Sequence, residues 1–323
     1  MSLTRGALRL LTTALAAIAT IAAGGVLAIG RPAAVPADAP AIDGVQRYRI
    51  IGKLNFAFFS LGSDDVGSAR ITVRSDAQGS TISLLAGSDP DHAPRRLNEW
   101  GYVREEIRPN GADVFVLRPA DPDDSSPADI VSRSSEPRFA ARCASVTERD
   151  LHSFATIVNG QPTTSFRTFT RLIDQLADAP PKWEAQHLAL PAGVQPGFLT
   201  ALQTVLRSDG QAAPYIYDGR VYDLSVRKMK VLGRTVVGAR VFETLTRSDM
   251  IVRNRRNGDT TKFAVTYVPG HAGVCLPVQI FYQPSFWVSV ELRQDDAADA
   301  PEDPAVTGAA LAQIRRICAE AAR

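Results

Sequence analysis

Apolar and polar residues alternate along much of the chain, and turn residues interrupt the alternation at short intervals. Val45–Ile51 alternates in this way, and the Asp-Gly pair at 218–219 separates two segments rich in aromatic and β-branched residues. Alternation with a period of two predicts strands with one buried face, and an Asp-Gly turn between such segments predicts a hairpin. We therefore expect antiparallel strands over 38–118 and again from Tyr215 to Arg293.

Three segments show helical spacing of their apolar residues instead. The first follows Thr164 or Ser165, the second runs from Pro196 to about Arg207, and the third lies near the C-terminus. Residues three and four apart share one face of a helix. Strands, then two helices, then more strands predict an α+β fold that is mainly antiparallel β. The apolar positions of the first helix are Phe166, Phe169, Leu172, Ile173 and Leu176, and those of the third are Leu311, Ile314 and Cys318.

The first 37 residues have the pattern of an export segment. Arg5 and Arg9 precede an uncharged run, Leu10–Gly30, that is rich in Ala, Leu and Ile. As a helix this run would be about 30 Å long, which is the thickness of bilayer hydrocarbon, whereas the apolar part of a cleaved signal is usually shorter. Cleavage after Ala37 and retention as an anchor both stay open. The preceding positive charge predicts a periplasmic protein, or an inner-membrane-anchored one with its bulk in the periplasm.

Composition indicates where the segments of the chain begin and end, but it does not identify a binding partner. A net charge of +2 is far below that of typical nucleic-acid-binding domains, so we expect no nucleic-acid partner. Pro, Asp and Ser dominate one internal stretch, and an acidic Ala/Asp/Pro linker precedes the last helix. We expect a signal peptide or signal anchor over 1–37, antiparallel strands over 38–118, a flexible loop over 119–145, helices and strands of the same sheet domain over 146–293, and a linker with the C-terminal helix over 294–323.

The chain has three cysteines, Cys143, Cys275 and Cys318. Their spacings are too wide for a CxxC redox motif or a zinc ribbon, and in an oxidising compartment one disulfide plus one free thiol is the natural arrangement. We expect Cys275 to pair with Cys318, which would tie the C-terminal helix to a strand. Three buried thiols are the alternative.

Three short motifs carry a resemblance to a known family. They are PGFLTAL at 196–202, YDGRVYDL at 217–224 and LPVQIFY at 276–282. With them, the stretch from Phe198 to Leu292 resembles the domain-of-unknown-function 3108 family of exported bacterial proteins, whose members are similar to the LolA/LolB-like lipoprotein-carrier fold. The resemblance implies a curved incomplete barrel wrapped on the two central helices. The residue pattern itself adds an N-terminal apolar helix and a C-terminal amphipathic helix. The resemblance implies no chemistry.

A curved sheet with one open side would leave a concave apolar face that helices or a lipid can fill. Aromatic residues are the candidates for lining that face, although they would serve equally well as core. A cationic group on a predicted hairpin, Arg253, Arg255 and Arg256, is a candidate for contact with an anionic head group, unless it is only a solvated turn. The candidate lining residues are Tyr215, Tyr217, Phe281, Phe286 and Trp287.

The sequence contains none of the GxSxG, HExxH, P-loop or GxGxxG motifs, and its four histidines are scattered. We therefore expect no catalytic residue, no metal and no cofactor. The leading hypothesis is a non-enzymatic, exported binding module of the cell envelope whose partner is a lipid, another hydrophobic ligand or an envelope protein. Membrane contact would come through the N-terminal segment if it stays uncleaved. The alternatives are an envelope scaffold with a filled core and an unrecognised hydrolase.

Overall fold

The computed structural model describes residues 42–56, 59–76, 79–93, 98, 100–120, 138–161, 164–178, 182–208, 210–217, 219–269, 275–285, 288–298 and 308–323. The expected export segment, the stretch 121–137, Phe286 and Trp287 lie outside these residues. Within the described part, no helix combines the length and the apolar character that a membrane crossing needs.

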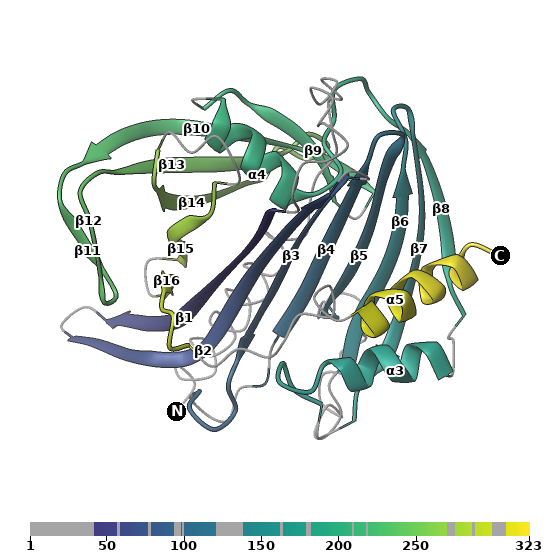
Figure 1. Ribbon diagram of the computed structural model, residues 1–323, viewed down its shortest axis with the longest axis horizontal. Helices are drawn as coiled ribbons and strands as arrows, with labels where there is room; N and C mark the ends of the chain where they lie inside the picture. The colour runs from purple at the N-terminus through teal and green to yellow at the C-terminus, as the bar shows by residue number, and fades with distance from the viewer. Residues whose placement is uncertain are drawn as a thin grey trace.

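Fourteen strands form one antiparallel sheet that is not closed into a barrel (Figure 1). Two further short strands form a separate hairpin, and three helices complete the described structure, which is mostly antiparallel β as the alternation predicts. The strands are β1 (Ile42–Phe56), β2 (Phe59–Asp76), β3 (Gly79–Ser88), β4 (Trp100–Arg108), β5 (Gly111–Pro119), β6 (Arg138–Val146), β7 (Asp150–Asn159), β8 (Glu184–Ala189), β9 (Ala213–Tyr217), β10 (Arg220–Leu232), β11 (Thr235–Val237), β12 (Arg240–Phe242), β13 (Leu245–Asn254), β14 (Thr260–Tyr267), β15 (Pro277–Ser285) and β16 (Val288–Gln294), and the helices are α3 (Thr170–Asp178), α4 (Phe198–Arg207) and α5 (Gly308–Ala321).

The sheet joins the two ends of the chain. Strands β1 to β8 follow one another in order, and the last strand, β16, pairs with β1, with Ile50 opposite Leu292. The full order is β8-β7-β6-β5-β4-β3-β2-β1-β16-β15-β14-β13-β10-β9, so β8 and β9 are its two edges. Although β8 and β9 are only about 25 residues apart in sequence, they form opposite edges of the sheet.

The two faces of the sheet carry different helices. On β4, Val103 points to a core that includes α4, whereas Tyr102 points to a second core that includes α3 and α5. Successive side chains of a strand point to opposite faces, so α4 covers one face and α3 with α5 the other; Figure 1 shows α3 and α5 side by side over the strands around β6. The expectation of a sheet wrapped on both central helices is therefore wrong for α3.

The helix predictions are confirmed in position and in buried face. All five predicted apolar positions of the first helix are buried, although α3 begins only at Thr170. The residues before it form a turn in which the Ser165 amide donates to the Thr168 hydroxyl at 3.0 Å. In α5, Ile314 is buried while Arg315 and Arg316 are exposed, as the pattern predicts. The expected loop 119–145 is wrong at its end, because 138–145 belongs to β6.

The disulfide joins Cys143 and Cys318, with 5.3 Å between their Cα atoms, and Cys275 is a buried free thiol. The expected pairing of Cys275 with Cys318 is therefore wrong. Cys275 belongs to the core that contains α4, whereas α5 packs on the opposite face, where Cys143 of β6 lies. A disulfide needs Cα atoms within about 7 Å, and the sheet stands between Cys275 and α5.

Candidate functional site

The two edge strands of the sheet come together at one place. Gly219, directly before β10, lies against Gln186 of β8, so closely that a Cβ atom on Gly219 would lie 2.4 Å from Gln186 Nε2. Gly219 also has a φ of +67°, which glycine adopts without strain. Nearby, Gln195 forms one isolated bridge with Tyr215. Gln195 belongs to the segment between β8 and α4, so this bridge does not join the edge strands themselves. The sheet thus curls until its two edges meet through side chains, with no ladder between the described residues of β8 and β9. We call this junction the seam.

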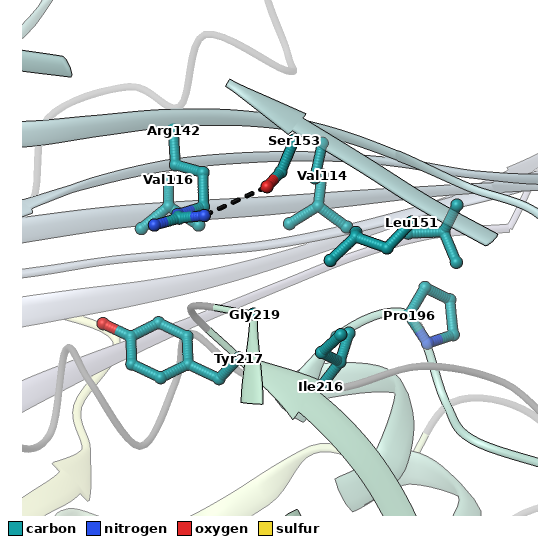
Figure 2. Close-up of a pocket in the computed structure, with 12 residues that line it drawn as sticks. Val114, Val116, Arg142, Leu151, Ser153, Pro196, Ile216, Tyr217 and Gly219 are labelled. Carbon is teal, nitrogen blue, oxygen red and sulfur yellow. Dashed lines mark hydrogen bonds between the residues drawn. The ribbon is translucent and has the colours of Figure 1, made fainter. Parts of the chain in front are cut away.

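A pocket lies at the seam (Figure 2). It is an open depression, and the space within it is about 380 Å³ when the solvent at its mouth is counted. One wall consists of alternate residues of three neighbouring strands, which face Tyr217 and Ile216 of β9 and the start of α4. The wall residues are Val114 and Val116 of β5, Arg142, Ala144 and Val146 of β6, and Leu151 and Ser153 of β7, and the opposite side is completed by Pro196, Gly197 and Gly219.

Among the lining residues that the structure describes, Arg142 is the one that carries a charge. Its Nη1 atom donates to the Ser153 hydroxyl at 3.1 Å and reaches Gln186 Oε1 at 3.5 Å. Figure 2 shows Arg142 and Ser153 side by side on the strand wall, with the Tyr217 ring on the opposite side of the pocket. A guanidinium offers five N–H donors in a fixed plane and suits a carboxylate or phosphate. The pocket therefore combines a cation and two hydroxyls with walls that are otherwise apolar.

The start of α4 is fixed by a buried carboxylate from another strand. Gly197, at the N-cap, provides no side chain, and Glu105 of β4 takes that role. Its oxygens accept hydrogen bonds from the Leu199 amide at 3.0 Å, the Thr200 amide at 2.8 Å and the Thr200 hydroxyl at 2.5 Å. Helix N-termini attract negative charge in this way. The Glu105 carboxyl group holds in place the segment that closes one side of the pocket.

Burial dominates the titration of Glu105. The side chain is fully buried, and burial raises its pKa to about 7 although the three hydrogen bonds from α4 act in the opposite direction. Gly197 leaves room for the carboxylate, since a Cβ atom there would lie 1.3 Å from Glu105 Cδ. Any larger residue at 197 would displace either the carboxylate or the helix.

Of the five aromatic residues predicted to line a ligand site, only Tyr217 lines this pocket. Tyr215 is 3% exposed and belongs to the core, where its ring stacks on Tyr222 at 5.3 Å. Phe281 is half-buried, with the Arg247 guanidinium 6.0 Å above its ring. Phe286 and Trp287 lie outside the described residues.

The predicted cationic group lies at the turn between β13 and β14. Arg253, Arg255 and Arg256 are exposed there. The Arg255 guanidinium pairs with Asp223 at 2.6 Å, so part of this charge is neutralised within the fold. A head-group contact of these arginines stays a prediction.

Sequence reasoning missed Arg142, Ser153 and Glu105. A signal for Arg142 was present, because Phe139, Ala141 and Cys143 alternate with it in the way that strand residues do. The Pro/Asp/Ser-rich stretch before β6 hid this alternation. For Glu105 no local signal exists, since its partners lie 94 and 95 residues away.

A second polar group lies on the other face of β7 and β8. The rings of His152 and His187 stack at 4.4 Å, and His187 Nε2 lies 3.1 Å from an oxygen of Asp150. Both rings are exposed. In the part of the chain that the structure describes, no group of three or more His, Cys, Asp or Glu side chains could hold a metal ion.

Comparison of the chain with protein-family models, with curated proteins and with solved structures found no match. The resemblance to the domain-of-unknown-function 3108 family therefore stays a prediction, and any function has to be argued from the seam pocket itself.

Proposed function

We propose that this chain is a non-enzymatic binding protein of the bacterial cell envelope, and that it holds a small amphipathic anion in the seam pocket. The observation that carries the proposal is the guanidinium of Arg142 inside an otherwise apolar lining. The acyl part of a ligand would contact Val114, Val116 and Leu151, and its carboxylate or phosphate would contact Arg142. Such a lining, with few polar groups that set the orientation, is typical of small-molecule sites.

The energetics favour a ligand that has both an acyl part and an anionic group. Each buried methylene group contributes roughly 0.8 kcal/mol, and hydrogen bonds to charged groups contribute about 1.5–3 kcal/mol. An uncharged hydrocarbon would contact the apolar walls but would make no charged hydrogen bond with Arg142. An inorganic anion would leave the apolar walls without a partner. An acyl carboxylate uses both features of the lining.

The export of the protein is supported by two independent features. The first 37 residues have the pattern of an export segment, and the disulfide between Cys143 and Cys318 suits an oxidising compartment. We also propose that the sheet acts as an incomplete barrel curled around α4, as the family resemblance implies. In that arrangement, a ligand reaches the pocket between β9 and the β7–β8 edge, where a ladder is absent.

Equilibrium dialysis with two probes tests this proposal. The full-length chain in phosphatidylcholine nanodiscs is dialysed against radiolabelled octanoate and, separately, octanol, with empty nanodiscs as background. We expect octanoate to bind with 1:1 stoichiometry. Arg142→Gln should weaken octanoate binding at least about tenfold, which corresponds to the lower end of a charged hydrogen bond, and should leave octanol binding unchanged.

Two further variants control for indirect effects. Ala144→Leu should fill the pocket and weaken both probes, because Ala144 is part of its lining. Arg149→Gln removes an exposed arginine from the turn between β6 and β7 and should change neither. Equal octanoate affinities for wild type and Arg142→Gln would remove the anion from the proposal.

A second candidate function is an envelope scaffold, and one observation favours it. Helix α4 fills the face of the sheet that a carrier would leave open, with Phe198, Leu199 and Leu202 all buried. The absence of both octanoate and octanol binding from a folded chain would favour this candidate.

A further inference from the structure

Large apolar side chains that remain exposed are concentrated in one part of the described structure. The hairpin of β11 and β12 extends the far ends of β10 and β13, at the opposite end of the molecule from α5 (Figure 1). We call residues 227–243 the arm. Six large apolar residues of the described chain are exposed, and four of them belong to the arm: Met229 at 39%, Val231 at 66%, Val236 at 67% and Val241 at 51%.

The exposure of the arm valines has a geometric basis. Val236 and Val241 lie directly opposite each other in the hairpin, so they share a face. Their neighbours Val237 and Phe242 point the other way and pack in a small core with Leu245. The hairpin is therefore held by one apolar face and presents a second apolar face to the outside. A hairpin that served only as a surface loop would have polar residues on that second face.

The arm is also strongly basic. It contains five cationic residues and one acid, Glu243, which gives a formal charge of +4 against +2 for the whole chain. Arg240 pairs with Asp296 at 2.5 Å, and Arg234 lies 3.7 Å from Glu243. The other three cations, Arg227, Lys228 and Lys230, are exposed and have no ion pair with a described carboxylate.

The positive charge of the arm lowers the stability of the strand ladder that carries it. Lys230 stands opposite Arg247 in the ladder of β10 and β13, and like charges in opposite positions are destabilising. Asp249, opposite Lys228, pairs with Arg247 at 3.3 Å instead of with the lysine. Lys228 and Lys230 alternate with Met229 and Val231 along β10, so the arm presents cations and apolar side chains on its two faces. A hairpin with both features favours a partner that is negative and apolar at once.

We propose that the arm docks on an anionic lipid surface, with the valines at the acyl boundary and the lysines at the head groups. Apolar residues flanked by Lys and Arg are the signature of segments that lie in a membrane interface. Beyond Leu224, β10 pairs with β13 on one side and has no partner among the described strands on the other. Addition of another strand at that open side is disfavoured, because lysines protect such an edge from pairing. The arm contributes no residue to the seam pocket, so this inference is independent of the ligand.

An environment-sensitive fluorophore tests the docking in the full-length chain. The label is attached to Val236→Cys; the native free thiol, Cys275, is buried, and the other two cysteines are paired. The protein is incorporated into vesicles of phosphatidylcholine, with or without phosphatidylglycerol. We expect the label to shift to the blue and to be quenched by lipid-borne quenchers only when phosphatidylglycerol is present. A label at Ile157→Cys, an exposed apolar position on β7, should stay in water in both.

Charge reversal gives the decisive comparison. Lys228→Glu/Lys230→Glu should lower the ratio of docked to undocked arm at least about twentyfold, since each basic residue near an anionic surface changes partitioning by roughly fivefold. Arg171→Glu/Arg316→Glu is the matched control, because these exposed arginines lie on α3 and α5, at the opposite end of the molecule from the arm (Figure 1).

Three outcomes would overturn the proposal. One is a label at position 236 that stays in water on anionic vesicles, and another is an equal loss of docking in the matched control. The third is a blue shift that appears without lipid and grows with protein concentration, which would assign the arm to contact with a second copy of the chain.

Discussion

Glu105→Gln is the perturbation that tests how the seam pocket is held. The carboxyl group of Glu105 is buried under the first turn of α4, where it accepts three hydrogen bonds from Leu199 and Thr200. Burial nevertheless raises its pKa from an ordinary 4.5 to about 7. A glutamine has nearly the same shape but does not titrate, so the two proteins should differ in the pH dependence of their stability.

The size and sign of this pH dependence of stability follow from the linkage between protonation and folding. The folded state holds the proton up to a pH of about 7, whereas an unfolded chain releases it near 4.5. The folded state thus binds more protons in this window, and stability falls as the pH rises through it. At roughly 1.4 kcal/mol per pKa unit, the loss amounts to about 3 kcal/mol. Above a pH of about 7 both states are ionised and the dependence ends.

Urea unfolding of the full-length chain at several pH values between 5 and 8 measures this loss. The free energy of unfolding of the wild type should fall by about 2–3 kcal/mol relative to Glu105→Gln across that range. Glu148→Gln, which changes an exposed residue in the β6–β7 turn, should run parallel to the wild type. A wild type that gains stability relative to Glu105→Gln with rising pH would refute the reasoning. It would mean that the amides of α4 keep the carboxylate ionised.

Two further predictions concern the opposite face, where α5 is attached. Cys318→Ser should lower the free energy of unfolding by about 2–4 kcal/mol, measured by urea unfolding without reductant. In the wild type, a thiol reagent should modify Cys275 alone, and it should do so only once the protein is unfolded. Burial acts to raise the pKa of Glu106, but the hydrogen bond from Arg315 and the charges of Arg104 and Arg108 outweigh it and lower the pKa to about 2. The resulting stability is present above a pH of about 4.5 and is lost as the pH falls toward 2, so Glu106→Gln should be less stable than the wild type at neutral pH and should approach it in acid unfolding curves.

Local periodicity predicted what depends on neighbours in the sequence. Alternation located the strands, and spacing of three and four located the buried faces of the helices, including Leu172, Ile173 and Leu176 of α3. These patterns succeed because one side of each element faces the core wherever the element lies. They hold equally well on either face of a sheet, and for that reason the sequence did not indicate that α3 and α4 pack on opposite sides.

The errors share this physical origin. The choice of Cys275 as the partner of Cys318 required knowing which face α5 covers, and that depends on packing between elements more than a hundred residues apart. Arg142 was overlooked because β6 follows a stretch whose composition is typical of loops. Tyr217 was a candidate as an aromatic residue, but Tyr215, two residues away and on the same face of β9, is core. Only the position of the seam distinguishes the two tyrosines.

The position of the pocket also has a thermodynamic consequence. Strands β8 and β9 end the sheet, and no ladder joins their described residues. At the seam Gln186 of β8 contacts Gly219, and apolar side chains including Leu151 of β7 and Ile216 of β9 pack together. Parting β8 from β9 breaks no strand ladder, whereas parting two neighbouring strands within the sheet does, so local opening should be easiest at the seam. A ligand that contacts Arg142 on one side and Tyr217 on the other binds only the closed arrangement. The binding free energy of the ligand that we propose would therefore add to the stability of the seam.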